Sequence, residues 1–146
     1  MYRNFFISLF LVLGILISPV YAQNESIEIF EDLQGVIIAL SDSIKPSVVH
    51  IDVVQKIQNQ KFKTLGSGLV IDKDGYILTN EHVVDNAQSI TVTLPSKLEY
   101  PAEIIGTDKQ TDLALIKIET AEKLEVARLG DSDECKVGEW VIAVGN

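Results

Sequence analysis

The sequence is poor in cysteine and histidine, and each shortage excludes a class of protein. Its single cysteine, Cys135, cannot form a disulfide within the chain, so stability has to come from a packed core. The two histidines, His50 and His82, are 32 residues apart, and no His-Glu-x-x-His motif or pair of cysteines completes a zinc site. We therefore expect no metal and no cofactor.

Basic residues are also scarce. The chain has 12 Lys and Arg against 21 Asp and Glu, which gives a formal net charge of −9. An acidic surface repels phosphate backbones, and no basic stripe with interleaved aromatic residues is present. We expect no nucleic-acid partner.

Only one long hydrophobic run is present, at the N-terminus. It covers residues 5–18, follows Arg3 and is followed by Val20-Tyr21-Ala22, an arrangement typical of an export signal with cleavage after Ala22. The run has about 14 residues, fewer than the roughly 20 that span a bilayer as a helix. The sequence therefore predicts a signal peptide over residues 1–22 and an exported protein. A membrane anchor is the alternative if this segment is not cleaved.

The segment after the signal has helical periodicity. Apolar residues such as Phe30, Leu33, Ile37 and Leu40 recur at steps of three and four, which predicts an amphipathic helix over residues 23–43, ending before Pro46. We assign residues 23–45 to an N-terminal helical segment.

The rest of the chain has the pattern of an all-β domain. Segments rich in β-branched residues predict six strands with no helix of ordinary length between them, over residues 48–54, 68–72, 76–79, 89–94, 102–105 and 113–118. Asp72-Lys73-Asp74-Gly75 has the composition of a tight hairpin turn. Consecutive antiparallel strands of this kind favour a six-stranded antiparallel barrel over residues 46–120.

Two segments have less regular patterns. Residues 55–64 are rich in Gln and Lys, and we expect a solvated loop there. Residues 140–144 are apolar and predict a seventh strand, which the barrel does not need. We assign residues 121–146 to a linker and the start of a second, truncated barrel.

Two polar residues lie where these strands meet their turns. His82 follows the strand over 76–79, and Asp112 precedes the strand over 113–118, 30 residues later. The two intervening strands can return the chain to the same rim of the barrel. A histidine base and an orienting aspartate, in that chain order, are the first two members of a chymotrypsin-type triad. His50, by contrast, is expected to be an ordinary strand residue.

The residues around this pair resemble a known family. Five blocks, in this order, are similar to the first half of an HtrA (Deg) type trypsin-like serine protease: Gly66-Ser67-Gly68-Leu69-Val70-Ile71, Gly75-Tyr76-Ile77-Leu78-Thr79-Asn80-Glu81-His82-Val83-Val84, Thr111-Asp112-Leu113-Ala114-Leu115-Ile116-Lys117, Leu129-Gly130-Asp131-Ser132 and Val137-Gly138-Glu139-Trp140-Val141-Ile142-Ala143-Val144-Gly145-Asn146. The resemblance covers about residues 45–146.

The resemblance implies the first barrel of a chymotrypsin-like double barrel, with His82 as general base and Asp112 as its orienting acid. It also implies a periplasmic quality-control endopeptidase that cleaves misfolded or unfolded proteins, forms homo-oligomers and in many members carries PDZ domains. The family's nucleophile lies in a Gly-x-Ser-Gly-Gly block, and these 146 residues contain none. Ser67 does not replace it, because it precedes the histidine and the family uses the same Gly-Ser-Gly as a structural element.

Two interpretations remain open. In the first, the chain is the N-terminal fragment of a serine endopeptidase and is inactive by itself. In the second, it is a non-catalytic module of one barrel that binds or regulates a partner.

Overall fold

The computed structural model describes residues 27–57 and 60–145. The predicted signal peptide and the first residues of the predicted helix lie outside the described residues. The chain divides into two compact units, residues 1–40 and 41–146. In the first unit the described residues form a helix, which continues to residue 44 and agrees with the helix predicted over 23–43. No helix in the described part is long and apolar enough to cross a membrane.

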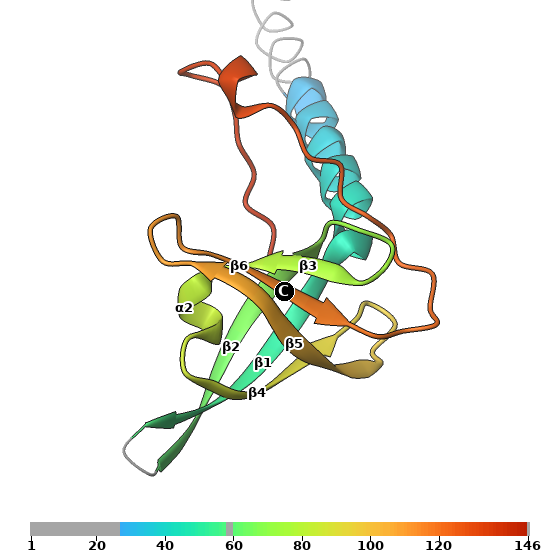
Figure 1. The fold of residues 1–146 in the computed structure, drawn as a ribbon. Helices are drawn as coiled ribbons and strands as arrows, with labels where there is room; N and C mark the ends of the chain where they lie inside the picture. The colour runs from blue at the N-terminus through green and yellow to red at the C-terminus, as the bar shows by residue number, and fades with distance from the viewer. Residues whose placement is uncertain (1–26, 58–59, 146) are drawn as a thin grey trace, which may run out of the picture. The chain divides into compact units, whose positions relative to one another are not determined.

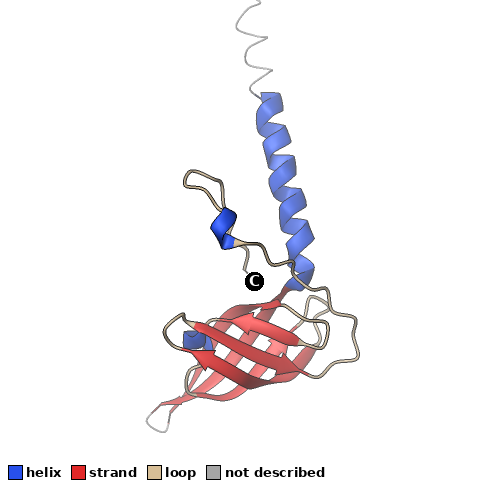
Figure 2. Cartoon of the chain, turned by 45° about the horizontal axis from the view of Figure 1, so that its top comes forward, coloured by secondary structure: helices blue, strands red, loops and turns tan. Residues whose placement is uncertain are grey.

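The second unit is built around a closed barrel of six antiparallel strands (Figures 1 and 2). A short 3-10 helix, η1 (Lys45–Ser47), directly precedes the barrel. The strands are β1 (Val48–Ile57), β2 (Gln60–Val70), β3 (Tyr76–Thr79), β4 (Ala87–Thr93), β5 (Glu99–Asp108) and β6 (Leu113–Ile118). Around the barrel their order is β1-β2-β3-β6-β5-β4, and the ring closes because β1 pairs with β4 as well as with β2. The predicted six-stranded barrel is confirmed.

The core of this barrel follows the alternation of its strands. Val49, Ile51 and Val53 on β1 are fully buried, whereas His50 and Asp52 between them lie on the outer face. The other strands contribute further fully buried aliphatic residues, among them Val70, Ile77, Val92, Ile116 and Ile118. Each such side chain stabilises the fold by about 1.5–3 kcal/mol relative to exposure. Packing of this kind gives the barrel its stability without disulfides.

A tight turn joins β2 to β3, as predicted. Gly75 has a φ of +94°, and a Cβ added there would lie 2.3 Å from the carbonyl oxygen of Ile118. Only glycine fits both conditions. The turn therefore fixes β3 beside β6, which is the pairing that positions the candidate site.

The predicted loop over residues 55–64 is wrong. Its described residues, 55–57 and 60–64, belong to β1 and β2, with Gln55 opposite Phe62 and Lys56 opposite Lys61. The predicted strand over residues 140–144 is also wrong, since these residues have no regular structure. A strand needs a hydrogen-bonded partner, and none of the described strands pairs with this segment. The polar ends of β1 and β2, in contrast, pair with each other.

Candidate active site

His82 lies on a single helical turn, α2 (Glu81–Val84), between β3 and β4 (Figure 1). Val83 and Val84 are buried and anchor this turn on the barrel, while 68% of the His82 side chain is exposed. The turn can approach the sheet closely because of Gly66 on β2: a Cβ at that position would lie 2.6 Å from Cγ1 of Val83. The Gly-Ser-Gly segment thus helps to position the histidine.

Asp112 occupies the end of the turn between β5 and β6. Its φ is +55°, in the left-handed region that few residues other than glycine adopt. Asp108 shapes the same turn, since its carboxylate accepts hydrogen bonds from the N–H of Gln110 (2.9 Å) and the hydroxyl of Thr111 (2.8 Å). Both hydrogen bonds lower the pKa of Asp108, and the bond from Thr111 has the larger effect. The turn that presents Asp112 therefore has its own hydrogen bonds.

The register of the sheet brings the two residues together. Strands β3 and β6 are neighbours, and Thr79 at the end of β3 pairs with Ala114 near the start of β6. Nδ1 of His82 lies 2.7 Å from Oδ2 and 3.0 Å from Oδ1 of Asp112. The structure thus places the two predicted site residues within hydrogen-bond distance.

The backbone of α2 also contacts Asp112. The N–H of Glu81 donates to the main-chain carbonyl of Asp112 (3.1 Å), and the N–H of His82 donates to its Oδ1 (3.0 Å). These are two of the N–H groups that a helix leaves without partners at its N-terminus. Asp112 therefore caps the helical turn that carries the histidine.

These contacts determine which nitrogen of the neutral imidazole carries the hydrogen. The pKa of Asp112 is lowered from its ordinary value, chiefly by the hydrogen bond from the backbone N–H of His82 and next by the hydrogen bond from the His82 ring. An ionised carboxylate can only accept hydrogen bonds, so Nδ1 of His82 must carry the hydrogen. In the neutral imidazole, Nε2 then has a free lone pair and can act as a base.

Two further residues contact the pair or its supports, and the sequence alone predicts a role for neither. The side-chain amide of Asn80 donates to the carbonyl and to Oδ2 of Asp112, both at 3.2 Å. Nζ of Lys109 lies 3.4 Å from Glu81 and 3.5 Å from Asp85, which flank His82 in the chain. Asp85, then Glu81, raise the pKa of Lys109. In the sequence, Asn80 is marked only by its place in the block around His82, and Lys109 only by its place in the turn before Asp112.

The remaining candidates lie elsewhere. His50 is on the outer face of β1, where its Nε2 is 3.7 Å from Asp52, and Asp52 pairs at 2.7 Å with Lys63. Cys135 is exposed and follows a short 3-10 helix, η2 (Ser132–Glu134). Among residues 27–57 and 60–145, no three His, Cys, Asp or Glu side chains are grouped so that they could hold a metal ion. The His82–Asp112 pair is thus the candidate site.

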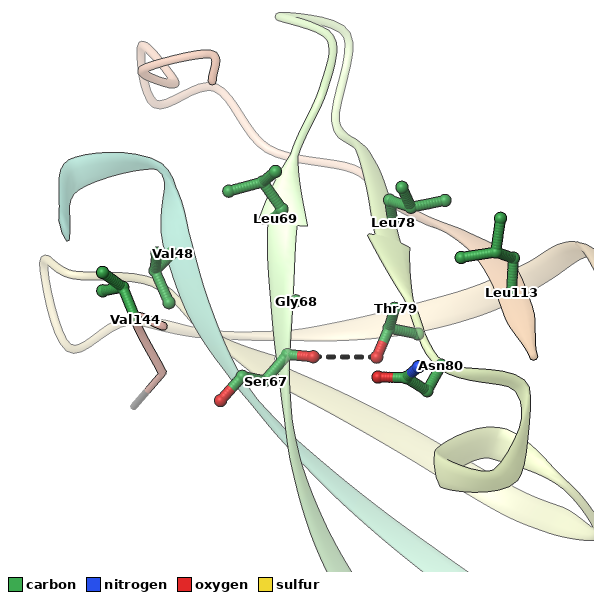
Figure 3. Close-up of a pocket in the computed structure, with 9 residues that line it drawn as sticks. All are labelled: Val48, Ser67, Gly68, Leu69, Leu78, Thr79, Asn80, Leu113 and Val144. Atoms are coloured by element: carbon green, nitrogen blue, oxygen red, sulfur yellow. Dashed lines mark hydrogen bonds between the residues drawn. The ribbon is translucent and has the colours of Figure 1, made fainter. Parts of the chain in front are cut away.

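An open cleft of about 300 Å³ adjoins the site on the outer face of the barrel (Figure 3). Leu69, Leu78 and Leu113 line it from β2, β3 and β6, and Asn80 is at its edge. Val144, from the C-terminal segment, lies beside Val48 on the other side of the cleft. Leu113 directly follows Asp112 in the chain and is 43% exposed. An apolar surface therefore extends up to the His82–Asp112 pair.

Comparison with known proteins gives consistent matches. The family model described as trypsin-like peptidase domain matches residues 66–146. The chain is 51% identical over 89 residues to a probable periplasmic serine endoprotease DegP-like of Marinomonas sp. (strain MWYL1), a match that covers 61% of this chain and 19% of that protein. A protein of the same description from Rickettsia prowazekii (strain Madrid E) is 39% identical over 107 residues, 73% of this chain and 21% of that protein. The chain thus spans about a fifth of the length of these curated relatives.

Proposed function

The chain belongs to the trypsin-like peptidase family, in its HtrA/Deg branch, and on this premise we propose that His82 and Asp112 are the general base and the orienting acid of a serine endopeptidase. The observation that carries the proposal is the 2.7 Å contact between Nδ1 of His82 and Oδ2 of Asp112. The backbone N–H of His82 also donates to Oδ1 of Asp112, so the helical turn that carries the histidine holds the aspartate in place.

The geometry supports a separate role for each of the two residues. Asp112 holds the imidazole with its hydrogen on Nδ1, so Nε2 is available to take the proton of a serine hydroxyl as that oxygen attacks a peptide carbonyl. The imidazole then becomes positively charged, and the carboxylate of Asp112 stabilises it without taking the proton. His82 next donates the proton to the leaving amine. Each of these steps needs a serine that these 146 residues do not supply in a Gly-x-Ser-Gly-Gly block.

We propose that the serine and the oxyanion donors belong to a second barrel in the complete protein. The apolar cleft supports this arrangement, because Leu69, Leu78 and Leu113 present aliphatic side chains outward in a cleft that Asn80 also lines. Loss of a triad nucleophile lowers kcat by about a millionfold. We therefore expect the 146-residue chain alone to be inactive.

The relatives suggest where this chemistry takes place. They are named as periplasmic endoproteases, and we infer a periplasmic location and protein substrates for this chain. Misfolded exported proteins are the substrate class that we propose, and homo-oligomers are the proposed assembly of the complete protein.

Two measurements test the proposal. The purified 146-residue chain should leave β-casein intact, and cleavage that a serine-directed inhibitor stops would contradict the proposed need for a second barrel. The genomic codons after Asn146 should continue an open frame that encodes Gly-x-Ser-Gly-Gly. In the product of that frame, His82→Ala should abolish casein cleavage. A stop codon directly after Asn146 would instead favour a non-catalytic, one-barrel binding module.

A further inference from the structure

Asn80 occupies the N-cap position of α2 but does not act as a cap. Its backbone has the extended conformation of an N-cap residue, with φ of −82° and ψ of 145°, yet its side chain makes no capping hydrogen bond. Asparagine is among the best N-cap residues because its side-chain oxygen normally accepts from the next N–H groups of the helix. Here Asp112 accepts from the N–H groups of Glu81 and His82 instead.

The Asn80 side chain is turned toward Asp112. Its amide nitrogen lies 3.2 Å from the main-chain carbonyl and 3.2 Å from Oδ2 of that residue. Oδ2 is the oxygen that contacts Nδ1 of His82 at 2.7 Å. Asn80 thus contacts both the backbone and the carboxylate of the aspartate, and it shares Oδ2 with His82.

We propose that Asn80 is a positioning residue, which fixes the carboxylate of Asp112 in the orientation that keeps the hydrogen of His82 on Nδ1. The proposal rests on the proposed function of the pair and adds a third member to it. Asn80 does not touch the reacting atoms and acts only through Asp112.

The backbone of Asp112 shows why such a residue is needed. A left-handed conformation is unfavourable for a residue other than glycine, although aspartate tolerates it better than most. At a φ of +55°, the Asp112 carbonyl accepts two hydrogen bonds, from the N–H of Glu81 and from the amide of Asn80. The second bond, together with the one to Oδ2, joins the strained backbone to the carboxylate.

The chemistry of the contact requires an amide. An aspartate at position 80 has the same shape and is an equally good N-cap, but when ionised it can only accept hydrogen bonds. It would place a second negative charge beside Asp112. A serine is also a good N-cap, but its single hydroxyl hydrogen cannot be donated to two acceptors. A mere capping role therefore predicts that Asn80→Asp and Asn80→Ser are tolerated, whereas the positioning role predicts that both are harmful.

The ring nitrogen shifts of His82 in the 15N-labelled 146-residue chain give a direct test. At about pH 9, well above the ordinary histidine pKa of about 6.5, these shifts report which ring nitrogen carries the hydrogen. The chain has two histidines, so His50 serves as an internal reference and the variant His50→Gln assigns the signals. We expect the Nδ1–H form for His82 in the wild type. In Asn80→Ala, Asn80→Asp and Asn80→Ser, His82 should shift toward the mixture of a free imidazole.

The matched control is Gln110→Ala, which removes an exposed amide from the turn that carries Asp112. It should leave His82 in the Nδ1–H form. The amide spectrum of each variant checks the fold, and loss of the native spectrum in all three Asn80 variants would assign Asn80 to folding and overturn the positioning role.

Failure of this inference can be told from failure of the proposed function. If His82 keeps the Nδ1–H form in the folded Asn80 variants, Asn80 has no positioning role, while the His82–Asp112 pair stands. If the wild-type His82 already shows the free mixture, the pair itself does not form and both proposals are wrong.

Discussion

The contact between Gly66 and α2 determines how closely the histidine turn approaches the barrel, and Gly66→Ala tests it. A Cβ on residue 66 would lie 2.6 Å from Cγ1 and 3.0 Å from Cγ2 of Val83. Distances this short force Val83, and with it the turn, to move. The substitution is expected to destabilise the chain and displace His82.

The size of the effect follows from two opposing contributions. Overpacking costs about 1–3 kcal/mol, whereas replacing a strand glycine by alanine returns about 0.5–1 kcal/mol of backbone entropy. A net loss of up to about 2.5 kcal/mol is expected. Val83→Ala removes two buried methyl groups, and the loss of each lowers stability by about 0.8 kcal/mol. These two methyl groups are the atoms that a Cβ on residue 66 would meet. The double variant should therefore be more stable than the sum of the two single changes predicts, by about 1–3 kcal/mol.

Urea unfolding of the wild type, the two single variants and the double variant measures this coupling. Gly106→Ala is the matched control, because it changes a strand glycine whose added Cβ meets no atom within 4 Å. The control should be neutral or slightly stabilising. Strict additivity of Gly66→Ala and Val83→Ala would refute the idea that Gly66 makes room for α2.

Two other substitutions, in three measurements, test different parts of the site. The pKa of Asp112 is lower in the folded chain, so the stability that its carboxylate contributes is present above the unfolded pKa of about 3.9 and is lost as the pH falls through the folded pKa. Asp112→Asn should therefore make the free energy of unfolding in urea less dependent on pH below about pH 5. A pH profile of stability parallel to that of the wild type would contradict this. Gly75→Ala should cost more than about 1 kcal/mol in the same assay, since it combines a φ of +94° with a 2.3 Å approach to Ile118, and a neutral effect would mean that the turn can rearrange. In the complete protein, Asp112→Asn should lower kcat on casein by about 10⁴-fold, and a loss below tenfold would exclude Asp112 as the orienting acid.

The barrel was predictable where the local pattern agreed with its environment. Strands β3 and β6 have the predicted bounds, because β-branched and aliphatic residues there alternate between the core and the outer face. The turn at Gly75 was predictable for a similar reason, since its glycine is needed locally. The proximity of His82 and Asp112 could be predicted because the motif around each is specific.

Other features depend on partners distant in the sequence. Residues 55–57 and 60–64 resemble a loop because most of their side chains are polar, but two paired strands can expose such side chains and still satisfy their backbone hydrogen bonds. The segment over 140–144 has strand composition and no partner among the described strands. The role of Asn80 arises only after the register of β3 and β6 places it beside Asp112.

The pairing of β3 with β6 has a consequence for how the chain acquires its site during folding. The two strands are separated in sequence by α2, β4 and β5, so their pairing is a long-range event whose loop-closure entropy must be overcome. His82 and Asp112 can meet only once that pairing is in place. The Nδ1–H form of His82 therefore reports on the pairing of β3 with β6. In a refolding experiment, this form should not appear before the amides shared by β3 and β6 gain protection from exchange.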